Sequence, residues 1–276
     1  PLIVDIDDWE LGFFYHSGFW GGVGRFLNFS NPNGLPYVWR IERLVGEADG
    51  VSVSNRFLQK KFKGVLLPHC RDTSALDPQK FSPGKIKERI GLAGKKVVMF
   101  LGTPRPHKGI DDLLIALKKI NIPELRLVII GAENQQEFLK GVDPSVIDRV
   151  VVLPKISFQN LPEFLSAADI VAIPQRQTSD SVGQMPAKLF DAMSMAKPII
   201  ATRVSDIPEV LEDCGYLVDP SEPSQLADCI QYILSHPAEA KTKGYAARER
   251  CKQRYDMHHL ECGLHELVEH VSAKKG

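Results

Sequence analysis

The sequence lacks the features of three classes of protein. Lys plus Arg and Asp plus Glu both number 34, so the net charge is zero and the basic footprint of a nucleic-acid-binding protein is absent. No apolar run is long enough to span a membrane, and no signal-peptide pattern is visible. The five cysteines are scattered and include no Cys-x-x-Cys pair, which is typical of reduced thiols. We therefore expect a cytoplasmic protein that has no nucleic-acid partner.

The 276 residues are enough for two domains, and an apolar content of 43% with 25% charged residues is typical of a globular protein. The stretch after Asp72, rich in Pro, Ser and Asp, has the composition of a domain junction. We predict a partial α/β domain over residues 1–79 and a second domain over residues 80–276. Because Pro1 already lies within a predicted strand, we expect a fragment that lacks the front half of its first domain.

Short apolar runs alternate with segments of helical periodicity. This alternation predicts βαβ units and a Rossmann-like, doubly wound parallel sheet. The predicted strands are Leu2–Ile6, Gly50–Ser54, Gly64–Pro68, Val97–Leu101, Leu125–Ile130, Val150–Leu153, Ile170–Ile173, Pro198–Ala201 and Tyr216–Val218. The predicted helices are Tyr37–Glu47, Arg56–Phe62, Ile110–Ile120, Gln135–Gly141, Leu161–Ala168, Pro186–Met195, Ile207–Asp213, Pro223–Ser235 and the tail Ala238–Ala273.

The stretch from Val97 to Gly109 is the most informative part of the chain. A buried strand ends at Gly102, and Pro104 and Pro106 stiffen the loop that follows and exclude helix there. The loop carries Thr103, Arg105, His107 and Lys108 before a helix begins. Free N–H groups at a helix start together with two cations suit a diphosphate, although solvated surface charges are an equally good interpretation of this loop alone.

A second anion site is predicted between Ser179 and Pro198. A polar loop with Gly183 leads into a helix whose first residue is Pro186. Lys188 and Asp191 are three residues apart and lie on the same helix face, so the cation can meet a phosphate and the carboxylate can accept hydrogen bonds from a ribose. A surface ion pair is at least as good an interpretation in isolation.

Two features of the first 30 residues have weaker interpretations. Asp5 and Asp7 match the Asp-x-Asp pattern of metal-dependent enzymes, but the match is short and a solvated acidic turn is the better interpretation. The aromatic and glycine-rich stretch from Phe13 to Phe29 could line an acceptor pocket or touch a membrane surface. We expect plain core packing for its aromatic side chains.

Four blocks occur in an order that resembles the donor domain of glycosyltransferase family four, the retaining enzymes of the GT-B fold. The blocks are Gly102 with Lys108-Gly109, Val128-Ile-Ile-Gly131-Ala-Glu133, the block from Gly183 to Ala201, and Asp206-Ile-Pro-Glu-Val. The resemblance covers residues 80 to 260. Residues 1 to 79 resemble the second half of the N-terminal domain of that family, with Pro68-His-Cys-Arg-Asp72 in the interdomain position.

The resemblance implies roles for particular residues. Lys108 would hold the donor diphosphate, Asp191 the ribose, and the backbone at Pro154-Lys-Ile156 the base. The catalytic group would comprise Lys108, Arg105 and Asp8. The donor-binding set would be Gly102, Thr103, Lys108, Gly109, Gly131, Glu133, Lys155, Ile156, Gly183, Gln184, Met185, Pro186, Lys188 and Asp191.

The chain also departs from the family pattern. Thr103 replaces the family's arginine, and Arg105 is a possible substitute two residues on. Gly183 stands where the first acid of the family's pair is expected, as in a subset with a Pro-x-Lys-Leu signature that Pro186-Ala-Lys-Leu189 fits. The residue that contacts the transferred sugar is therefore open.

The expected function is that of a retaining glycosyltransferase. It would use a UDP- or GDP-sugar donor without a metal or other cofactor, and its acceptor would be a glycan, a lipid or a small molecule. Its location would be the cytoplasm, with peripheral membrane contact as a further possibility. A sugar-nucleotide binding module without turnover, a sugar-nucleotide epimerase of the same fold and a metal-dependent phosphoryl enzyme remain alternatives.

Overall fold

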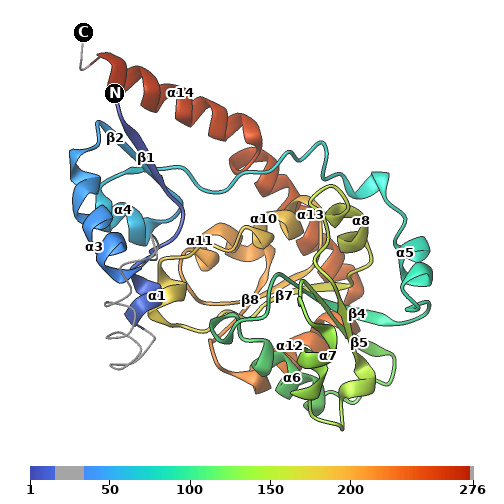
Figure 1. The fold of residues 1–276 in the computed structure, drawn as a ribbon. Coiled ribbons are helices and arrows are strands. Elements are labelled where there is room, and N and C mark those ends of the chain that lie inside the picture. The colour runs from blue at the N-terminus through green and yellow to red at the C-terminus, as the bar shows by residue number, and fades with distance from the viewer. Residues whose placement is uncertain (16–33, 274–276) are drawn as a thin grey trace.

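A computed structural model describes residues 1–15 and 34–273 and contains two parallel sheets (Figure 1). The smaller sheet has the order β1-β2-β3, with β1 at Ile3–Ile6, β2 at Gly50–Val53 and β3 at Val65–Leu66. Its helices are α1 (Gly12–Tyr15), α3 (Leu35–Leu44) and α4 (Arg56–Phe62), with a 3₁₀ turn, η1, at Val45–Glu47. The Asn55 side chain caps α4 by accepting a hydrogen bond from the Leu58 amide at 2.9 Å.

The larger sheet has six parallel strands in the order β6-β5-β4-β7-β8-β9. The strands are β4 (Lys96–Leu101), β5 (Leu125–Ile130), β6 (Val150–Leu153), β7 (Ile170–Ile173), β8 (Ile199–Thr202) and β9 (Tyr216–Val218). The strand order reverses between β4 and β7. Open α/β sheets place their ligand crevice at such a reversal, outside the carboxyl ends of the strands.

Helices cover both faces of this sheet. The helices of this part of the chain are α5 (Pro83–Arg89), α6 (Ile110–Lys119), α7 (Gln135–Lys140), α8 (Leu161–Ser166), α9 (Ser179–Val182), α10 (Lys188–Ser194), α11 (Ile207–Leu211), α12 (Pro223–Ser235) and α13 (Pro237–Arg254). The chain ends with α14 (Met257–Ala273). Short 3₁₀ turns lie at Pro78–Lys80 (η2), Pro106–Lys108 (η3), Ile147–Arg149 (η4) and Glu212–Cys214 (η5).

Alternate residues of β4 show why both faces need cover. Val97 and Met99 pack on one face with side chains of α8, α10 and α11, whereas Val98 and Phe100 pack on the other face with side chains of α6 and α12. A strand that is buried on both sides must be apolar throughout, which is why its sequence reads as an uninterrupted run. The predicted doubly wound α/β fold is confirmed.

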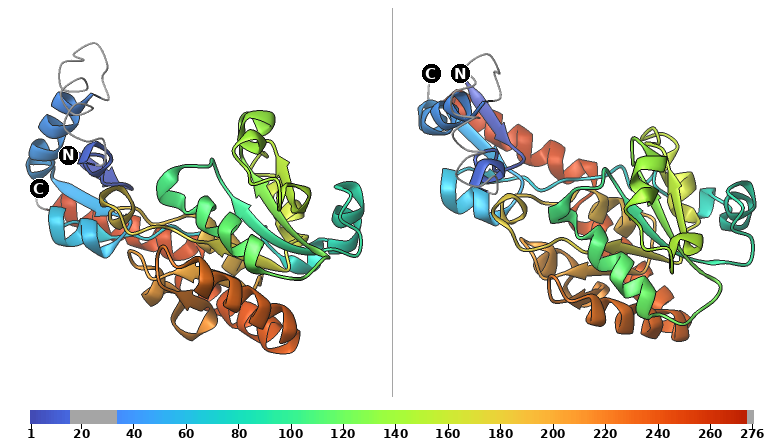
Figure 2. Two further views of the ribbon diagram at one scale, coloured as in Figure 1. Left: turned by 90° about the horizontal axis from the view of Figure 1, so that it is seen from below. Right: turned by 60° about the horizontal axis from the view of Figure 1, so that its bottom comes forward.

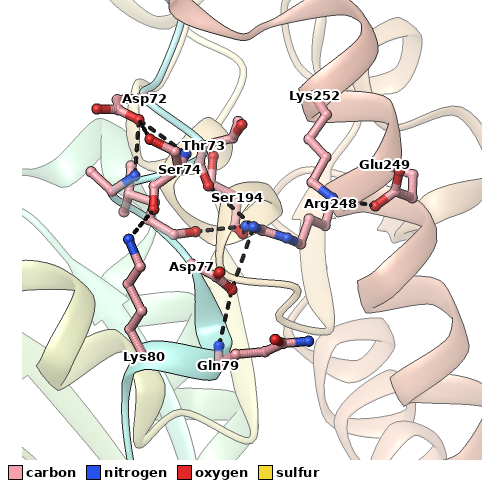
Figure 3. A network of polar contacts seen from close by, with 12 residues as sticks. Asp72, Thr73, Ser74, Asp77, Gln79, Lys80, Ser194, Arg248, Glu249 and Lys252 are labelled. Atoms are coloured by element: carbon pink, nitrogen blue, oxygen red, sulfur yellow. Dashed lines mark hydrogen bonds and ion pairs between the residues drawn. The ribbon is translucent and has the colours of Figure 1, made fainter.

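The linker between the two sheets, residues 67–82, is fixed by one buried arginine (Figure 3). Arg248 of α13 donates hydrogen bonds to the carbonyls of Leu76 at 2.6 Å and Thr73 at 3.1 Å, and also to that of Ser194 at the end of α10. Its guanidinium lies 3.5 Å from the Asp77 carboxylate. One side chain of α13 therefore joins the linker to α10.

The last helix, α14, returns to the smaller sheet (Figure 2). Leu267 and Val271 of α14 lie against Gly50 of β2, where a Cβ atom would come within 2.7 Å of Val271. The boundary between residues 79 and 80 stays a prediction. The position of α14 shows, however, that the smaller sheet takes part of its cover from the end of the chain.

The strands and most helices were predicted correctly, and the differences have local causes. The segment Pro106–Lys108 forms a 3₁₀ turn, although we expected the two prolines to exclude helix, because proline suits the first position of such a turn. Ser179–Val182 is a short helix where a loop was expected, since Thr178 and Ser181 form a capping box. Helix α10 begins at Lys188 and not at Pro186.

Two further expectations concern apolar side chains. Ile41 and Leu44 of α3 are 59% and 53% exposed, so the predicted apolar side of this helix is not buried, whereas Val45 is. Most of the aromatic stretch from Phe13 to Phe29 lies outside the described residues; Phe13 and Phe14 are half-buried. Among the helices that the structure describes, none combines the length and apolar character needed to cross a bilayer.

Candidate functional site

A cavity of about 400 Å³ lies at the carboxyl ends of β4 and β7, where the strand order reverses. The smaller sheet contributes Asp7 and Asp8 from the segment after β1, and the linker contributes His69. The remaining lining residues are Leu101, Gly102, Thr103, Lys108, Ile130, Gly131, Lys155, Ile156, Leu161, Gln175, Gln184, Met185, Pro186, Ala187, Lys188 and Asp191. The cavity therefore lies between the two sheets.

The loop after β4 brings Lys108 to the cavity. Gly109 has a φ of +68°, and a Cβ atom there would lie 1.8 Å from the carbonyl oxygen of Pro174, so only glycine fits. This close approach fixes the loop against the end of β7. Burial lowers the pKa of Lys108, and the nearby Arg105 lowers it further. The charge of Asp8 opposes this shift, and a bound anion would raise the pKa of Lys108 further toward its usual value.

His107, which precedes Lys108, is buried and has a partner. Its Nδ1 lies 2.9 Å from an oxygen of Asp180 in α9, and the amide of Arg176 donates to the His107 carbonyl at 2.8 Å. Burial lowers the pKa of His107, and the Asp180 carboxylate opposes that shift. The pair fastens the loop that carries Lys108 to α9, so His107 has a positioning role.

Lys188 is a partly buried cation in the wall of the cavity. Its Nζ lies 3.9 Å from the centre of the Phe100 ring, and no carboxylate within ion-pair distance is found among the described residues. Burial lowers its pKa well below the usual value, and the charge of Lys108 adds to this effect. Two lysines line one cavity with no described carboxylate within ion-pair distance, and the charge of Asp8 offsets that of Lys108 only in part, so the arrangement suits an anion.

Asp191 of α10 does not point freely into the cavity. It forms an ion pair with Arg71 of the linker, whose guanidinium also donates to the carbonyls of Ala187 at 3.1 Å and Cys70 at 2.8 Å. Burial raises the pKa of Asp191, and Arg71 holds that rise in check. The carboxylate is therefore held by a charge from the other half of the molecule.

Asp8 contacts the loop that precedes α10. Its carboxylate accepts a hydrogen bond from Gln184 Nε2 at 3.1 Å, and the Trp9 amide donates to the Gly183 carbonyl at 3.1 Å. Burial raises the pKa of Asp8, and the bond from Gln184 lowers it. The segment after β1 is thus joined to the loop of the larger sheet by main-chain and side-chain contacts.

The structure brings most of the predicted site residues together. Twelve line the cavity: Asp8, Gly102, Thr103, Lys108, Gly131, Lys155, Ile156, Gln184, Met185, Pro186, Lys188 and Asp191. Arg105 and Glu133 are exposed and do not line it, and Gly109 and Gly183 lie behind it as packing positions. The roles assigned to these residues stay predictions.

Three residues near the site were missed by the sequence interpretation: His69, Arg71 and Gln175. The first two belong to the motif Pro68-His-Cys-Arg-Asp72, which was noted only as a junction. Gln175 follows β7 by two residues, at the strand end where open sheets place their ligands. That position was the available signal for it.

Among the residues that the structure describes, the Asp-x-Asp pattern does not form a metal-binding cluster with other side chains. Asp5 accepts a hydrogen bond from Ser52 Oγ at 2.5 Å, and the Asp7 carbonyl accepts one from Ser54 Oγ at 2.5 Å. In the described part of the chain, no three His, Cys, Asp or Glu side chains converge. These aspartates therefore have local partners in β2 and in the residue that follows it.

Comparison with known families gives one match. Residues 95–236 match the model of a family described as "Glycosyl transferases group 1". This segment is just over half of the chain and contains β4 to β9 together with most of the cavity lining.

Curated relatives give similar results. The chain is 27% identical over 224 residues to a GDP-mannose-dependent alpha-(1-6)-phosphatidylinositol monomannoside mannosyltransferase of Mycolicibacterium smegmatis, covering 75% of this chain and 59% of that protein. It is 28% identical over 236 residues to a D-inositol 3-phosphate glycosyltransferase of Segniliparus rotundus, covering 75% of this chain and 50% of that protein. The chain thus spans about half to three fifths of the length of these relatives.

Solved structures show the same fold. HepE of Anabaena in complex with UDP superimposes with a TM-score of 0.75 at 20% identity, covering 99% of this chain and 72% of that one. Sucrose-phosphate synthase of Thermosynechococcus elongatus gives a TM-score of 0.75 at 21% identity, covering 99% of this chain and 74% of that one. At such identities the likeness establishes the fold, which is of the GT-B type.

Proposed function

Because the chain belongs to the group 1 glycosyl transferases, we propose that it takes part in the transfer of a sugar from a nucleoside diphosphate sugar to an acceptor. The donor would bind in the cavity at the carboxyl ends of β4 and β7. The observation that carries this proposal is the pair of cavity lysines, Lys108 and Lys188, for which no carboxylate lies within ion-pair distance in the described structure. A diphosphate supplies the missing negative charge.

The same two lysines would lower the activation barrier of the transfer by stabilising the leaving group. Negative charge grows on the leaving diphosphate as the bond to the sugar breaks. Cations that are fixed in place and shielded from water stabilise that charge more in the transition state than in the ground state. Arg105 lies close enough to affect the charge state of Lys108 and would add to the positive field at the mouth of the site. Neither a metal ion nor another cofactor is part of the proposal.

The rest of the donor has candidate partners on both sides of the phosphates. Asp191 would accept hydrogen bonds from ribose hydroxyls, and Lys155 with Ile156 would contact the base, as the family resemblance implies. Asp8 lines the cavity from the smaller sheet and would face the transferred sugar. We propose retention of configuration at the anomeric carbon on the strength of the family resemblance.

For the base of the donor and for the acceptor, we propose only a class of molecule. The mannosyltransferase relative is named for GDP-mannose, and the HepE structures contain UDP or UDP-glucose. We therefore propose a UDP- or GDP-sugar as donor and a glycan, lipid or small molecule as acceptor. A cytoplasmic location with peripheral membrane contact is consistent with the phosphatidylinositol-linked acceptor in the name of that relative.

Binding of a nucleoside diphosphate tests the proposal directly. Titration calorimetry with UDP and GDP should show a site on the wild-type chain, and Lys108→Ala should weaken it by about 1.5–3 kcal/mol, the scale of a charge-assisted hydrogen bond. Lys96→Ala, at the other end of β4, is the matched control and should leave affinity unchanged. Binding that survives EDTA is expected. Unchanged affinity in a folded Lys108→Ala variant would refute the phosphate role.

Two alternatives make different predictions for the same chain. A binding module without turnover would bind the donor but neither hydrolyse nor transfer the sugar. A sugar-nucleotide epimerase would convert one nucleotide sugar into another without an acceptor. Product analysis after incubation with UDP-glucose or GDP-mannose, with and without an acceptor, separates the three.

A further inference from the structure

The cavity contains a buried side-chain oxygen without a partner. Gln175 follows β7, is only 2% exposed and lines the cavity. Its Oε1 makes no hydrogen bond within the described structure, whereas buried polar oxygens are normally paired. The Gln175 main chain is fixed independently, because Thr202 Oγ1 donates to its carbonyl at 2.6 Å. The backbone of Gln175 is therefore held in place, and its unpaired side-chain oxygen lacks a hydrogen-bond donor.

The orientation of this oxygen is determined by Asp8. The Asp8 carboxylate requires a donor, so the neighbouring amide of Gln184 must present Nε2 to it, at 3.1 Å. The Oε1 of Gln184 then faces Gln175 and accepts a hydrogen bond from Gln175 Nε2 at 3.5 Å. Asp8, Gln184 and Gln175 thus form a chain of hydrogen bonds, and the unpaired Oε1 of Gln175 lies at its end.

Gly183 explains why another residue must supply the contact to the transferred sugar. Gly183 occupies the position where the family resemblance places an acid that contacts the sugar. A Cβ atom at Gly183 would lie 2.3 Å from the Cβ atom of Trp9, so this backbone has no room for a carboxylate there. Three other charged groups of the cavity have a partner or an assigned role, because Asp191 pairs with Arg71 and the two lysines, Lys108 and Lys188, face the proposed phosphate site.

We infer that Gln175 is a specificity-determining residue whose Oε1 accepts a hydrogen bond from a hydroxyl or amide N–H of the transferred sugar. Gln184 is the positioning residue that sets its orientation. This inference rests on the proposed donor site and adds the identity of a sugar contact to it. An acceptor oxygen in a cavity that also contains the Asp8 carboxylate disfavours a uronate, so the matching donors carry a sugar without a carboxylate.

The test separates the sugar from the rest of the donor. Calorimetry on the 276-residue chain gives Kd values for UDP, GDP, UDP-glucose, UDP-N-acetylglucosamine and GDP-mannose. For the tightest nucleotide sugar, the ratio of its Kd to that of the matching diphosphate measures what the sugar contributes. Gln175→Leu should reduce this contribution by about three- to tenfold, the effect of one neutral hydrogen bond, and leave the affinity for the diphosphate unchanged.

Three further variants complete the design. Gln184→Leu should reduce the sugar contribution in the same direction, since it removes the group that orients Gln175. Gln177→Leu, on the exposed surface of the same loop, is the matched control and should change nothing. Gln175→Met also removes the oxygen and has a side chain of similar length. It replaces Gln175→Leu in the experiment if the Tm of Gln175→Leu is lower than that of the wild type.

Each outcome decides between the inference and the proposed function. A reduced sugar contribution with unchanged diphosphate binding supports the inference. An unchanged sugar contribution in a folded Gln175 variant overturns it, as does an equal loss for diphosphate and nucleotide sugar. If the wild-type chain binds no diphosphate at all, the proposed function itself fails.

Discussion

Arg71 of the linker and Asp191 of α10 form an ion pair across the boundary between the two sheets, and both belong to the surroundings of the donor cavity. The pair is largely buried, with side-chain exposures of 16% and 7%. The same carboxylate is the proposed ribose ligand. The chain therefore keeps this group ionised and oriented with a charge from its other half, and a ribose would meet a carboxylate whose position is already set.

Removal of Arg71 should cost stability in a pH-dependent way. In Arg71→Met, the buried Asp191 loses its counter-charge, and we expect a loss of about 2–3 kcal/mol near neutral pH, discounted for the partial exposure of the pair. Burial already raises the folded-state pKa of Asp191, and the loss of Arg71 raises it further. The folded variant therefore binds a proton more readily than the unfolded chain, and its deficit grows as the pH rises.

Urea unfolding at pH 5 and pH 8 measures this difference. Arg203→Met is the control, because the Arg203–Asp219 pair is exposed and its loss should cost less than 1 kcal/mol. An Arg71→Met deficit that is equal at both pH values would show that Asp191 does not depend on Arg71 for its charge.

Substitution of Lys188 should separate stability from binding. Lys188→Met keeps the volume and the contact with the Phe100 ring but removes a cation whose burial is unfavourable. We expect a rise in Tm of about 2–4 °C, equivalent to about 1 kcal/mol, in the free protein. Affinity for UDP or GDP should fall at least about tenfold. A variant that is less stable and binds normally would contradict the role of Lys188 as an anion ligand.

Binding of a diphosphate should take up protons at alkaline pH. The pKa values of Lys108 and Lys188 are lowered in the free protein, and an anion moves them back toward the usual value. Between the free and bound pKa values the complex holds more protons, so affinity falls as the pH rises. Calorimetry between pH 7 and pH 9 in two buffers of different ionisation enthalpy measures the uptake. Zero uptake throughout this range would mean that both lysines are fully charged before binding.

The hydrogen bonds of Arg248 to the linker and to α10, called the linker clamp here and shown in Figure 3, give a prediction about stability. Arg248→Met leaves three buried carbonyls without their donor and should lower the free energy of unfolding by about 3–5 kcal/mol. Lys252→Met, one turn further along α13, removes an exposed pair with Glu249 and should change stability by less than about 0.5 kcal/mol. Thermal unfolding of both variants provides the comparison. Equal effects would show that the clamp is not structural.

The smaller sheet should exchange its amide hydrogens faster than the larger one. The two clusters of buried side chains around the six-stranded sheet contain no described residue before Leu76, and β3 has only two residues. Fewer buried contacts lower the free energy of local opening. Hydrogen exchange followed by mass spectrometry should show β1–β3 opening before β4 and β7. Equally slow exchange in both sheets would show that the smaller sheet is fully supported.

The sequence was sufficient for the strands because doubly covered strands must be apolar throughout, and such runs are visible without a structure. The loop with Lys108 was predictable for the same reason, since it directly follows one of these runs. The partners of His107 and Asp191 were not, because Asp180 is 73 positions away from His107 and Arg71 is 120 positions from Asp191. Contacts of this kind depend on how the elements pack and have no local signal.

The chain passes between the two sheets at two places that lie side by side. At the first crossing, the Arg71 amide donates to the Tyr255 carbonyl at 2.8 Å, and the Met257 amide donates to the Arg71 carbonyl at 3.1 Å, at the junction of α13 and α14. Thr73 is tied to Asp256 at the same point. Because the two crossings are hydrogen-bonded to each other, we expect them to act as one hinge. The halves of the molecule around the two sheets would then rotate about a single axis and would not slide past each other. The hydrogen bond from Gln184 to Asp8 also joins the two halves, so we expect a rotation that separates the halves to break it and to release the orientation of Gln175 that depends on it.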